Sequence, residues 1–229
     1  MKRIAIVSTL MLFSLPGFAQ QKEQDRIKES GLVLKDIIEM PDKGIPHDLL
    51  DKSSCVVVFP SVKKAAFVVG GSYGRGVITC RTGKNYMGPW SAPAMFALEG
   101  ASFGFQIGGQ ATDLVLLIMN DKGARSVMSS KVKIGADASA AAGPVGRDAT
   151  ASTDIVLKAE ILSWSRAQGL FAGISLAGST LRSDDGGNKA LYGKDLSAQD
   201  IVFGGKVKAP AAAAGLLGEL KKVTPTHKQ

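Results

Sequence analysis

Short apolar runs rich in β-branched and aromatic residues recur along the middle of the chain, and glycine or turn residues separate them. Residues 55–59, 65–69 and 76–80 predict three strands, with a hairpin turn at 70–72 between the second and third. Further strands are predicted at 94–98, 102–108, 114–119, 132–137, 153–163 and 171–176. No repeat of fixed period occurs, so these runs can bury their apolar side chains only in a sheet-based core.

Helical patterns flank the predicted strands. Residues 22–40 predict an amphipathic helix that Pro41 ends, and residues 211–223 predict a C-terminal helix. Short helices are expected at 47–51 and from the turn at 120–123 through Val127. The apolar stripe of the first helix consists of Ile27, Leu34, Ile37 and Ile38.

These elements predict an α+β fold, in which a curled antiparallel sheet or partial β-barrel is flanked by N- and C-terminal helices. Glycine accounts for 27 of the 229 residues, and Gly104, Gly108 and Gly109 fall inside a strand pattern. Glycine there marks a bulge, a bend or a close backbone approach. A small barrel made of bent strands either encloses an apolar ligand or is filled by its own side chains.

The first 19 residues have the pattern of a secretory signal peptide. Lys2 and Arg3 precede an apolar run at 4–15, and small residues follow, so we expect cleavage before Gln20. An N-terminal membrane anchor is the alternative, but so short a run does not span a bilayer core of roughly 30 Å. We therefore expect an exported bacterial protein, periplasmic first and secreted second. Residues 20–229 are expected to form one domain, with its core at about 27–205 and a basic C-terminal helix and tail.

The net charge of +8 points to an anionic partner. Most of the excess lies in residues 53–147 and in the tail from Lys206. For an exported protein, an anionic phospholipid or membrane surface is a better partner than nucleic acid, which we do not expect. A solvated basic surface is the alternative. The candidate lipid-binding residues flank the predicted hairpin: Lys63, Lys64, Arg75, Arg81 and Lys84.

The chain is poor in the residues that carry catalysis and metal binding. It has two histidines and two cysteines, so we expect no metal, no cofactor and no enzyme activity. Residues 100–104 match the Gly-x-Ser-x-Gly pattern of serine esterases, which requires a strand-to-helix turn and a downstream histidine. The histidine downstream of Ser102 is His227, in the tail. Residues 184–188 lack the spaced acids of a calcium loop and are read as a surface turn.

Cys55 and Cys80 leave two alternatives open. An oxidising compartment favours a disulfide between them. In a three-strand meander, however, they lie at opposite ends of the sheet, whereas a disulfide needs Cα atoms within about 7 Å.

Five longer segments resemble the SYLF domain. In order, they are FPSVKKAAFVVGGSYGRGV (59–77), WSAPA (90–94), GASFGFQIGGQATDLVLLIMN (100–120), KVKIGADASAAAGPVGRDA (131–149) and SRAQGLFAGISLAGS (165–179). The resemblance covers about residues 27–205 and implies a non-enzymatic lipid-binding domain. Eukaryotic members are described as recognising phosphoinositides, and some fungal members as binding actin.

One departure from the family concerns the first helix. Eukaryotic members are described as contacting membranes partly through a basic amphipathic helix at the start of the domain. Here the helix carries acidic and basic residues together, which favours packing of its stripe on the sheet over membrane contact.

The sequence thus favours a lipid-binding domain at the cell envelope that takes an anionic, phosphatidylinositol-like headgroup. A structural or protein-interaction module, bound to an envelope protein, is the alternative. A serine esterase centred on Ser102 is a distant third.

Overall fold

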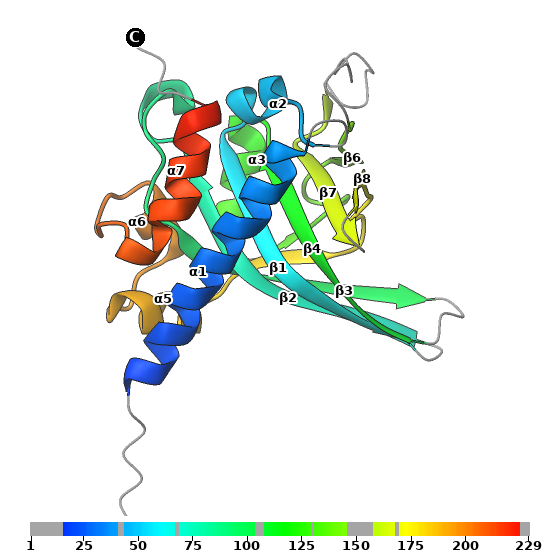
Figure 1. The fold of residues 1–229 in the computed structure, drawn as a ribbon, viewed down its shortest axis with the longest axis horizontal. Helices are drawn as coiled ribbons and strands as arrows, with labels where there is room; N and C mark the ends of the chain where they lie inside the picture. The colour runs from blue at the N-terminus through cyan, green and yellow to red at the C-terminus, as the bar shows by residue number, and fades with distance from the viewer. Residues whose placement is uncertain are drawn as a thin grey trace, which may run out of the picture.

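A single curled sheet, with helices on both of its faces, forms the centre of the molecule (Figure 1). The computed structural model describes residues 16–40, 44–66, 69–103, 108–129, 131–145, 158–167 and 170–224. The helices are α1 (Pro16–Glu39), α2 (His47–Lys52), α3 (Asp121–Met128), α5 (Asp185–Tyr192), α6 (Ala198–Val202) and α7 (Ala214–Val223), with 3-10 turns η1 (Lys84–Tyr86) and η2 (Ala211–Ala213). The strands are β1 (Cys55–Ala66), β2 (Val69–Cys80), β3 (Ala94–Phe103), β4 (Gly108–Ile118), β5 (Lys131–Lys133), β6 (Ala140–Ala142), β7 (Ile161–Ala167), β8 (Leu170–Gly173) and β9 (Thr180–Ser183).

The strand order confirms the expected α+β class with a curled, half-barrel sheet and helices at both ends. Within the described ranges, the order is β5-β9-β3-β2-β1-β4-β7-β6, and β8 pairs with β7. The sheet is mixed rather than wholly antiparallel, because β6 runs parallel to β7. The hairpin of β1 and β2 lies between β3 and β4, so these two strands pair with the hairpin and not with each other.

Both faces of the sheet are buried. Val56 and Val58 of β1 point to one face, which packs beneath α1 and α7 and is called the α1 face. Val57 and Phe59 point to the opposite face, where they join side chains of α3, α6 and β5. Strands covered on both faces have nearly continuous apolar sequences, which explains the runs seen in the sequence. The face opposite α1 is filled by the protein's own side chains.

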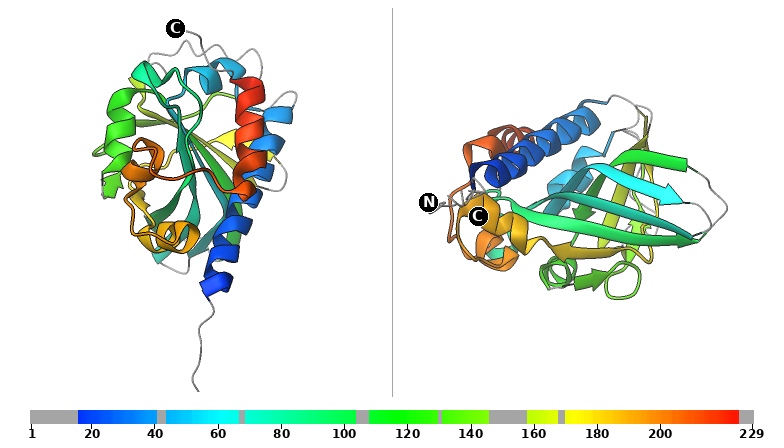
Figure 2. Two further views of the ribbon diagram at one scale, coloured as in Figure 1. Left: turned by 90° about the vertical axis from the view of Figure 1, so that its left-hand side faces the viewer. Right: turned by 90° about the horizontal axis from the view of Figure 1, so that it is seen from below.

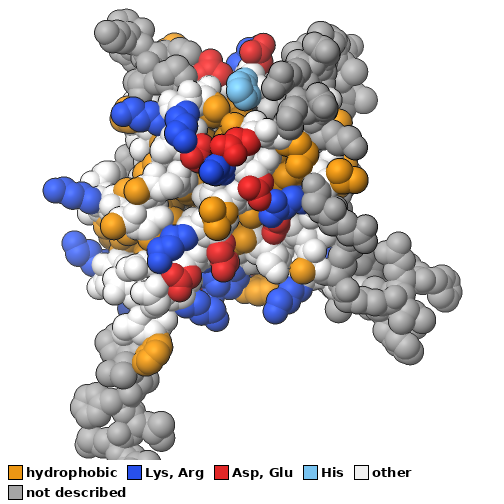
Figure 3. Space-filling model, in the orientation of Figure 1, with side chains coloured by type: hydrophobic (Ala, Val, Ile, Leu, Met, Phe, Trp, Pro, Cys, Tyr) orange, Lys and Arg blue, Asp and Glu red, His pale blue; other side chains and the backbone are white. Residues whose placement is uncertain are grey.

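Helix α1 buries the predicted apolar stripe. Ile27, Leu34 and Ile37 are fully buried and Ile38 is partly buried, in a cluster with residues of β1, β2, α5 and α7. The exposed side of α1 carries acidic and basic side chains together (Figure 3). No helix in the described ranges combines the length and hydropathy needed to cross a membrane. Helix α1 starts at Pro16, whereas residues 1–15 lie outside the described ranges, so signal-peptide cleavage stays a prediction.

The prediction of three strands between 55 and 80 is wrong, because β1 and β2 are two long strands. Gly70 and Gly71 lie inside β2, opposite Ala66 and Ala65, and not in a turn. The misreading arose at a β-bulge between 58 and 63, where Ser61 has a φ of 57° and the alternation of apolar residues breaks. The bulge was expected at glycines of β4, but it lies in β1.

Gly76 faces this bulge. A Cβ atom there would lie 2.0 Å from the carbonyl oxygen of Val58, so no larger residue fits without moving the backbone. This is the close backbone approach for which strand glycines are used.

The corrected strands resolve the two cysteines. Cys55 and Cys80 are directly opposite in the register of β1 and β2, and their sulfur atoms form a disulfide of 2.04 Å. Both residues are fully buried. The argument that placed them at opposite ends of the sheet fails because it rested on the three-strand meander.

The surface turn predicted at 184–188 is also wrong, because these residues begin α5. Asp184 caps the helix by accepting a hydrogen bond from the amide of Gly187 at 3.1 Å. Buried Asn188 accepts a hydrogen bond from the Met95 amide at 2.7 Å and so ties α5 to β3. Two consecutive glycines lower helix propensity and hid this helix.

Several other predicted boundaries shift. Strand β5 ends at Lys133 and β8 at Gly173, whereas β9 and α6 were not expected at all. The strands predicted at 102–108 and 153–163 fall partly on residues 104–107 and 151–157, which lie outside the described ranges.

Candidate functional site

Strands β1 to β4 extend past the helices as a ribbon, which we call the arm (Figures 1 and 2). The arm comprises residues 63–66, 69–73, 99–103 and 108–112. Its outer strands lose their neighbours where it begins, because β9 pairs with β3 only at 96–99 and β7 pairs with β4 only at 113–118. Within the described residues, the arm therefore has two open edges, along β3 and β4.

A polar row crosses the sheet at the base of the arm, on the α1 face. In register order it consists of Lys133, Thr180, Glu99, Tyr73 and Lys63. Directly opposite residues of paired strands share a face, so these five side chains form one band. Tyr73 is 48% exposed, and both lysines are exposed.

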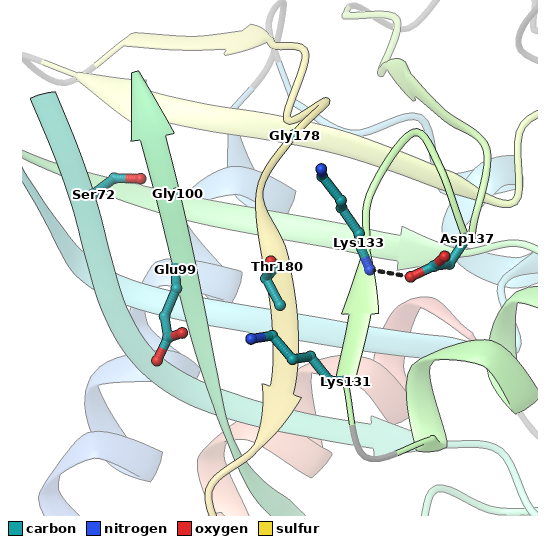
Figure 4. Close-up of a pocket in the computed structure, with 8 residues that line it drawn as sticks. All are labelled: Ser72, Glu99, Gly100, Lys131, Lys133, Asp137, Gly178 and Thr180. Atoms are coloured by element: carbon teal, nitrogen blue, oxygen red, sulfur yellow. Dashed lines mark hydrogen bonds between the residues drawn. The ribbon is translucent and has the colours of Figure 1, made fainter. Parts of the chain in front are cut away.

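The outer half of this row borders an open groove of about 650 Å³. Figure 4 shows Lys131 and Lys133 extending from β5 beside it. The Lys133 amide donates a hydrogen bond to Asp137 at 2.7 Å, and Arg182 forms an ion pair with Glu99 at 2.7 Å. The lining consists of Ser72, Glu99, Gly100, Lys131, Lys133, Asp137, Gly178 and Thr180.

The charges of this margin are unequally neutralised. Glu99 is paired with Arg182, whose pKa is raised by its hydrogen bond to that carboxylate. Among the described residues, by contrast, no carboxylate forms an ion pair with Lys63, Lys131 or Lys133. The margin therefore presents uncompensated ammonium groups to solvent.

Two of the five predicted lipid-binding residues lie at the arm. Lys63 and Lys64 are exposed and adjacent in β1, so they point to opposite faces of the sheet. Lys63 belongs to the polar row, and Lys64 lies opposite Ser72 on the other face.

Arg75 lies next to the arm but is held by internal contacts. Its guanidinium donates a hydrogen bond to Asp184 at 2.5 Å and forms an ion pair with Glu23 of α1 at 3.0 Å. Burial lowers the pKa of Arg75, but Asp184 and Glu23 outweigh it and raise the pKa overall. Arg75 thus fastens α1 and α5 to the sheet.

The other two predicted residues lie at the far end of the sheet. Arg81 is only 2% exposed, with its guanidinium 3.3 Å from Asp51, 3.2 Å from the carbonyl oxygen of Thr224 and 5.1 Å from the ring centre of Trp90. Lys84 is exposed in η1, after the end of β2. The five residues therefore do not form one patch, and the expectation that the hairpin gathers them is wrong.

Sequence reasoning missed Lys131 and Lys133. Residues 131–133 alternate exposed, buried and exposed, and lysines on a short strand are typical of the protected edge of a sheet. The Lys-Val-Lys pattern carried this signal, but its closeness to Lys63 depends on the pairing of five strands.

A second groove, of about 570 Å³, lies at the disulfide end of the sheet. The hydroxyl of Tyr86 donates a hydrogen bond to Asp121 at 2.9 Å, and the Tyr86 ring packs edge-on against Phe203. Burial, together with Asp121, raises the pKa of Tyr86 to about 12. The described residues contain no group of three or more histidine, cysteine or acidic side chains able to hold a metal.

Alkaline titration tests this environment. We expect Tyr86 to ionise near pH 12, so Tyr86→Phe removes that late step from the tyrosinate absorbance titration. Because the folded pKa lies above the unfolded value of about 10, the stability contributed by neutral Tyr86 is present below pH 10 and is lost as pH rises toward 12. A titration step near pH 10 that disappears in Tyr86→Phe would contradict this environment.

Ser102 does not have the setting of an esterase nucleophile. It lies within β3, opposite Gly70 of β2, and the strand continues to Phe103. A nucleophile elbow requires a sharp strand-to-helix turn at the serine. His227 lies outside the described residues.

The fold and its margin define a class: an α+β domain with a curled two-faced sheet, a buried disulfide and a lysine-bearing edge. Residues 99–223 match the family model described as "Ysc84: Las17-binding protein actin regulator". The chain belongs to the Ysc84 family, the SYLF domain family that the sequence segments resemble.

Curated relatives match over most of this chain. SH3 domain-containing YSC84-like protein 1 of Rattus norvegicus is 32% identical over 206 residues, which cover 87% of this chain and 59% of the relative. The Homo sapiens protein of the same name is 31% identical over the same spans. Protein YSC84 of Saccharomyces cerevisiae is 33% identical over 179 residues, or 77% of this chain and 37% of the relative. The chain thus spans well under two thirds of the length of these relatives.

Proposed function

We propose that this chain is a non-catalytic domain that binds anionic phospholipid surfaces at the cell envelope. The observation that carries the proposal is the set of exposed lysines at the sheet margin, Lys63, Lys64, Lys131 and Lys133. Basic residues near an anionic bilayer contribute about 1 kcal/mol each at low ionic strength. Four of them on one margin favour a phosphate-bearing surface, with a phosphatidylinositol-like headgroup as the finer expectation.

Vesicle co-sedimentation tests this function. Wild-type protein is expected to sediment with vesicles of equimolar phosphatidylcholine and phosphatidylglycerol, and the bound fraction should fall as salt is added. The double variants Lys63→Glu/Lys64→Glu and Lys131→Glu/Lys133→Glu should each weaken binding by roughly 30-fold or more, because each removes two favourable charges. Vesicles containing phosphatidylinositol phosphate test the finer expectation.

The matched control changes the same charge elsewhere. Lys194 and Lys208 are exposed near α5 and α6, and Lys194→Glu/Lys208→Glu alters net charge equally. It should weaken binding far less than either margin variant. Equal losses in all three variants would show that net charge, and not the margin, directs binding. Failure of wild type to bind any anionic vesicle would refute the function itself.

A protein-interaction module is the second candidate, and the open edges of the arm favour it. Residues 100–103 of β3 and 108–112 of β4 pair on one side only within the described residues. Such edges accept an added strand from a partner. The matching family model is described as Las17-binding, which names a protein ligand for that family. Sedimentation of wild type with an envelope protein but with no vesicle would favour this candidate.

Export to the periplasm, with secretion second, belongs to the same proposal. The signal-like pattern of residues 1–19 supports it, and so does the disulfide between Cys55 and Cys80, since disulfides persist in oxidising compartments. Fractionation of the native host tests it, and full-length protein retained in the cytoplasm would contradict it.

A further inference from the structure

The end of the arm is built from two sequence stretches without charge. No charged residue occurs between Lys64 and Arg75 or between Glu99 and Asp113. The sheet brings both stretches together, because Ala66 lies opposite Gly70 on one side and Gly108 on the other, and Val69 lies opposite Phe103. Neither stretch is long enough to be noticed alone.

A ring of charges surrounds the base of this neutral end. Lys63 and Lys64 place one ammonium group on each face of the sheet. The carboxylates at the same level are neutralised: Glu99 pairs with Arg182 at 2.7 Å, and Asp113 pairs with Arg166 at 2.6 Å. The arm therefore changes from positive at its base to neutral at its end.

This gradient matches the layers of an anionic bilayer, with phosphates outside and apolar chains within. We propose that the arm enters the bilayer interface end first and that Lys63 and Lys64 remain at the level of the lipid phosphates. The inference rests on the proposed membrane function and adds the part of the molecule that penetrates and its orientation.

The length and hydrogen bonding of the arm limit the depth. From the level of Lys64 to that of Ala66, the described strands advance two residues, or about 7 Å. Amphipathic elements that lie in the interface reach roughly 5–10 Å into it. Unpaired backbone groups along the open edges of β3 and β4 would be costly in hydrocarbon, which confines the arm to the hydrated interfacial layer.

A lipid surface explains the arm better than strand pairing with a second copy. Pairing along an open edge uses the backbone of β3 or β4 and has no use for lysines on both faces of the central strand β1. A bilayer surrounds an inserted element and contacts both faces. Both lysines then meet phosphate, which is the charge complementarity seen here.

A tryptophan reporter at Gly71 tests the inference. Gly71 is exposed in β2, and the nearest atom to an added Cβ is the carbonyl oxygen of Gly100, at 3.8 Å, so a side chain fits. Gly71→Trp is expected to bind phosphatidylcholine–phosphatidylglycerol vesicles roughly fivefold more tightly than wild type, because the interface buries apolar surface of the ring. Its added emission should shift to shorter wavelength and be quenched by lipids brominated near the headgroup end of their chains.

Ala214→Trp is the matched control, since Ala214 is exposed at the start of α7, away from the arm. Its added emission should not be quenched, and Trp90 and Trp164 supply the same background in both variants. Circular dichroism checks folding, and Ala111→Trp, at an exposed position level with Lys63, is a second reporter if Gly71→Trp does not fold.

The outcomes separate the two proposals. Wild-type binding with no quenching at Gly71→Trp, or at Ala111→Trp when that reporter is used, overturns the penetrating arm and leaves the membrane function in place. A wild-type dimer that Gly71→Trp disrupts, without quenching, overturns it in favour of pairing between copies. No wild-type binding to any vesicle overturns both.

Discussion

Replacing Cys55 and Cys80 together with alanine is expected to lower the free energy of unfolding by about 3.5 kcal/mol, because the 25-residue separation closes a loop that restricts the unfolded chain. For a domain of this size, that loss lowers Tm by roughly 7–14 °C. Calorimetry of the wild type and the double alanine variant measures it. Both cysteines are fully buried, so the folded arm should keep its structure in the variant.

The reductant supplies the control for this experiment. Adding dithiothreitol during unfolding should lower the wild-type midpoint toward that of the double variant and leave the variant unchanged. Thiol titration of denatured, unreduced wild type should find no free thiol. Two free thiols per chain, or a wild-type midpoint indifferent to reductant, would show that the bond is absent in solution.

Replacing Arg81 with methionine is expected to reduce stability by about 2–3 kcal/mol. The substitution keeps a long side chain but leaves the buried carbonyl of Thr224 without its donor and removes the cation from the ring of Trp90. Asp51 is 36% exposed in its side chain, so its lost ion pair adds little. Urea unfolding measures the stability, and hydrogen exchange of the last turn of α7 should accelerate because Thr224 follows that helix.

Two variants test whether the shape of the guanidinium matters. Arg81→Lys keeps the charge but lacks the planar fork that reaches Thr224 and stacks on Trp90, so it should recover only part of the loss. Arg125→Ala removes an exposed arginine that pairs with Asp121 within α3 and should change stability by less than about 0.5 kcal/mol. Full recovery by Arg81→Lys would reduce the role of Arg81 to charge alone. A lipid-binding defect without a stability loss in Arg81→Met would restore it as a surface contact.

The candidate site divides into residues that the sequence predicted and residues that it missed. Lys63 and Lys64 were predicted and are exposed as expected, because consecutive lysines in a strand are hard to bury on either face. Arg75 and Arg81 were predicted for the surface, but their partners Glu23, Asp184 and Thr224 are distant in sequence. Nothing local distinguishes an arginine held by such partners from one in solvent.

The strands show the same limit. The run from Cys55 to Phe59 was predicted correctly, because residues buried on both faces are apolar without interruption. The continuation of β1 through Pro60 and Ser61 was not predicted, since a bulge breaks the alternation that identifies a strand. That single error divided one long hairpin into a meander and separated the two cysteines.

By itself, the sequence determined the class of the fold, the apolar stripe of α1, the family and the scarcity of groups for catalysis. These follow from composition, periodicity and segment order, which neighbouring residues express. The tertiary structure alone decided the disulfide, the internal roles of Arg75 and Arg81, and the arm that joins two uncharged stretches beside Lys63 and Lys64. Each of these depends on the register between strands, and register is set by bulges and long-range packing that no local pattern records.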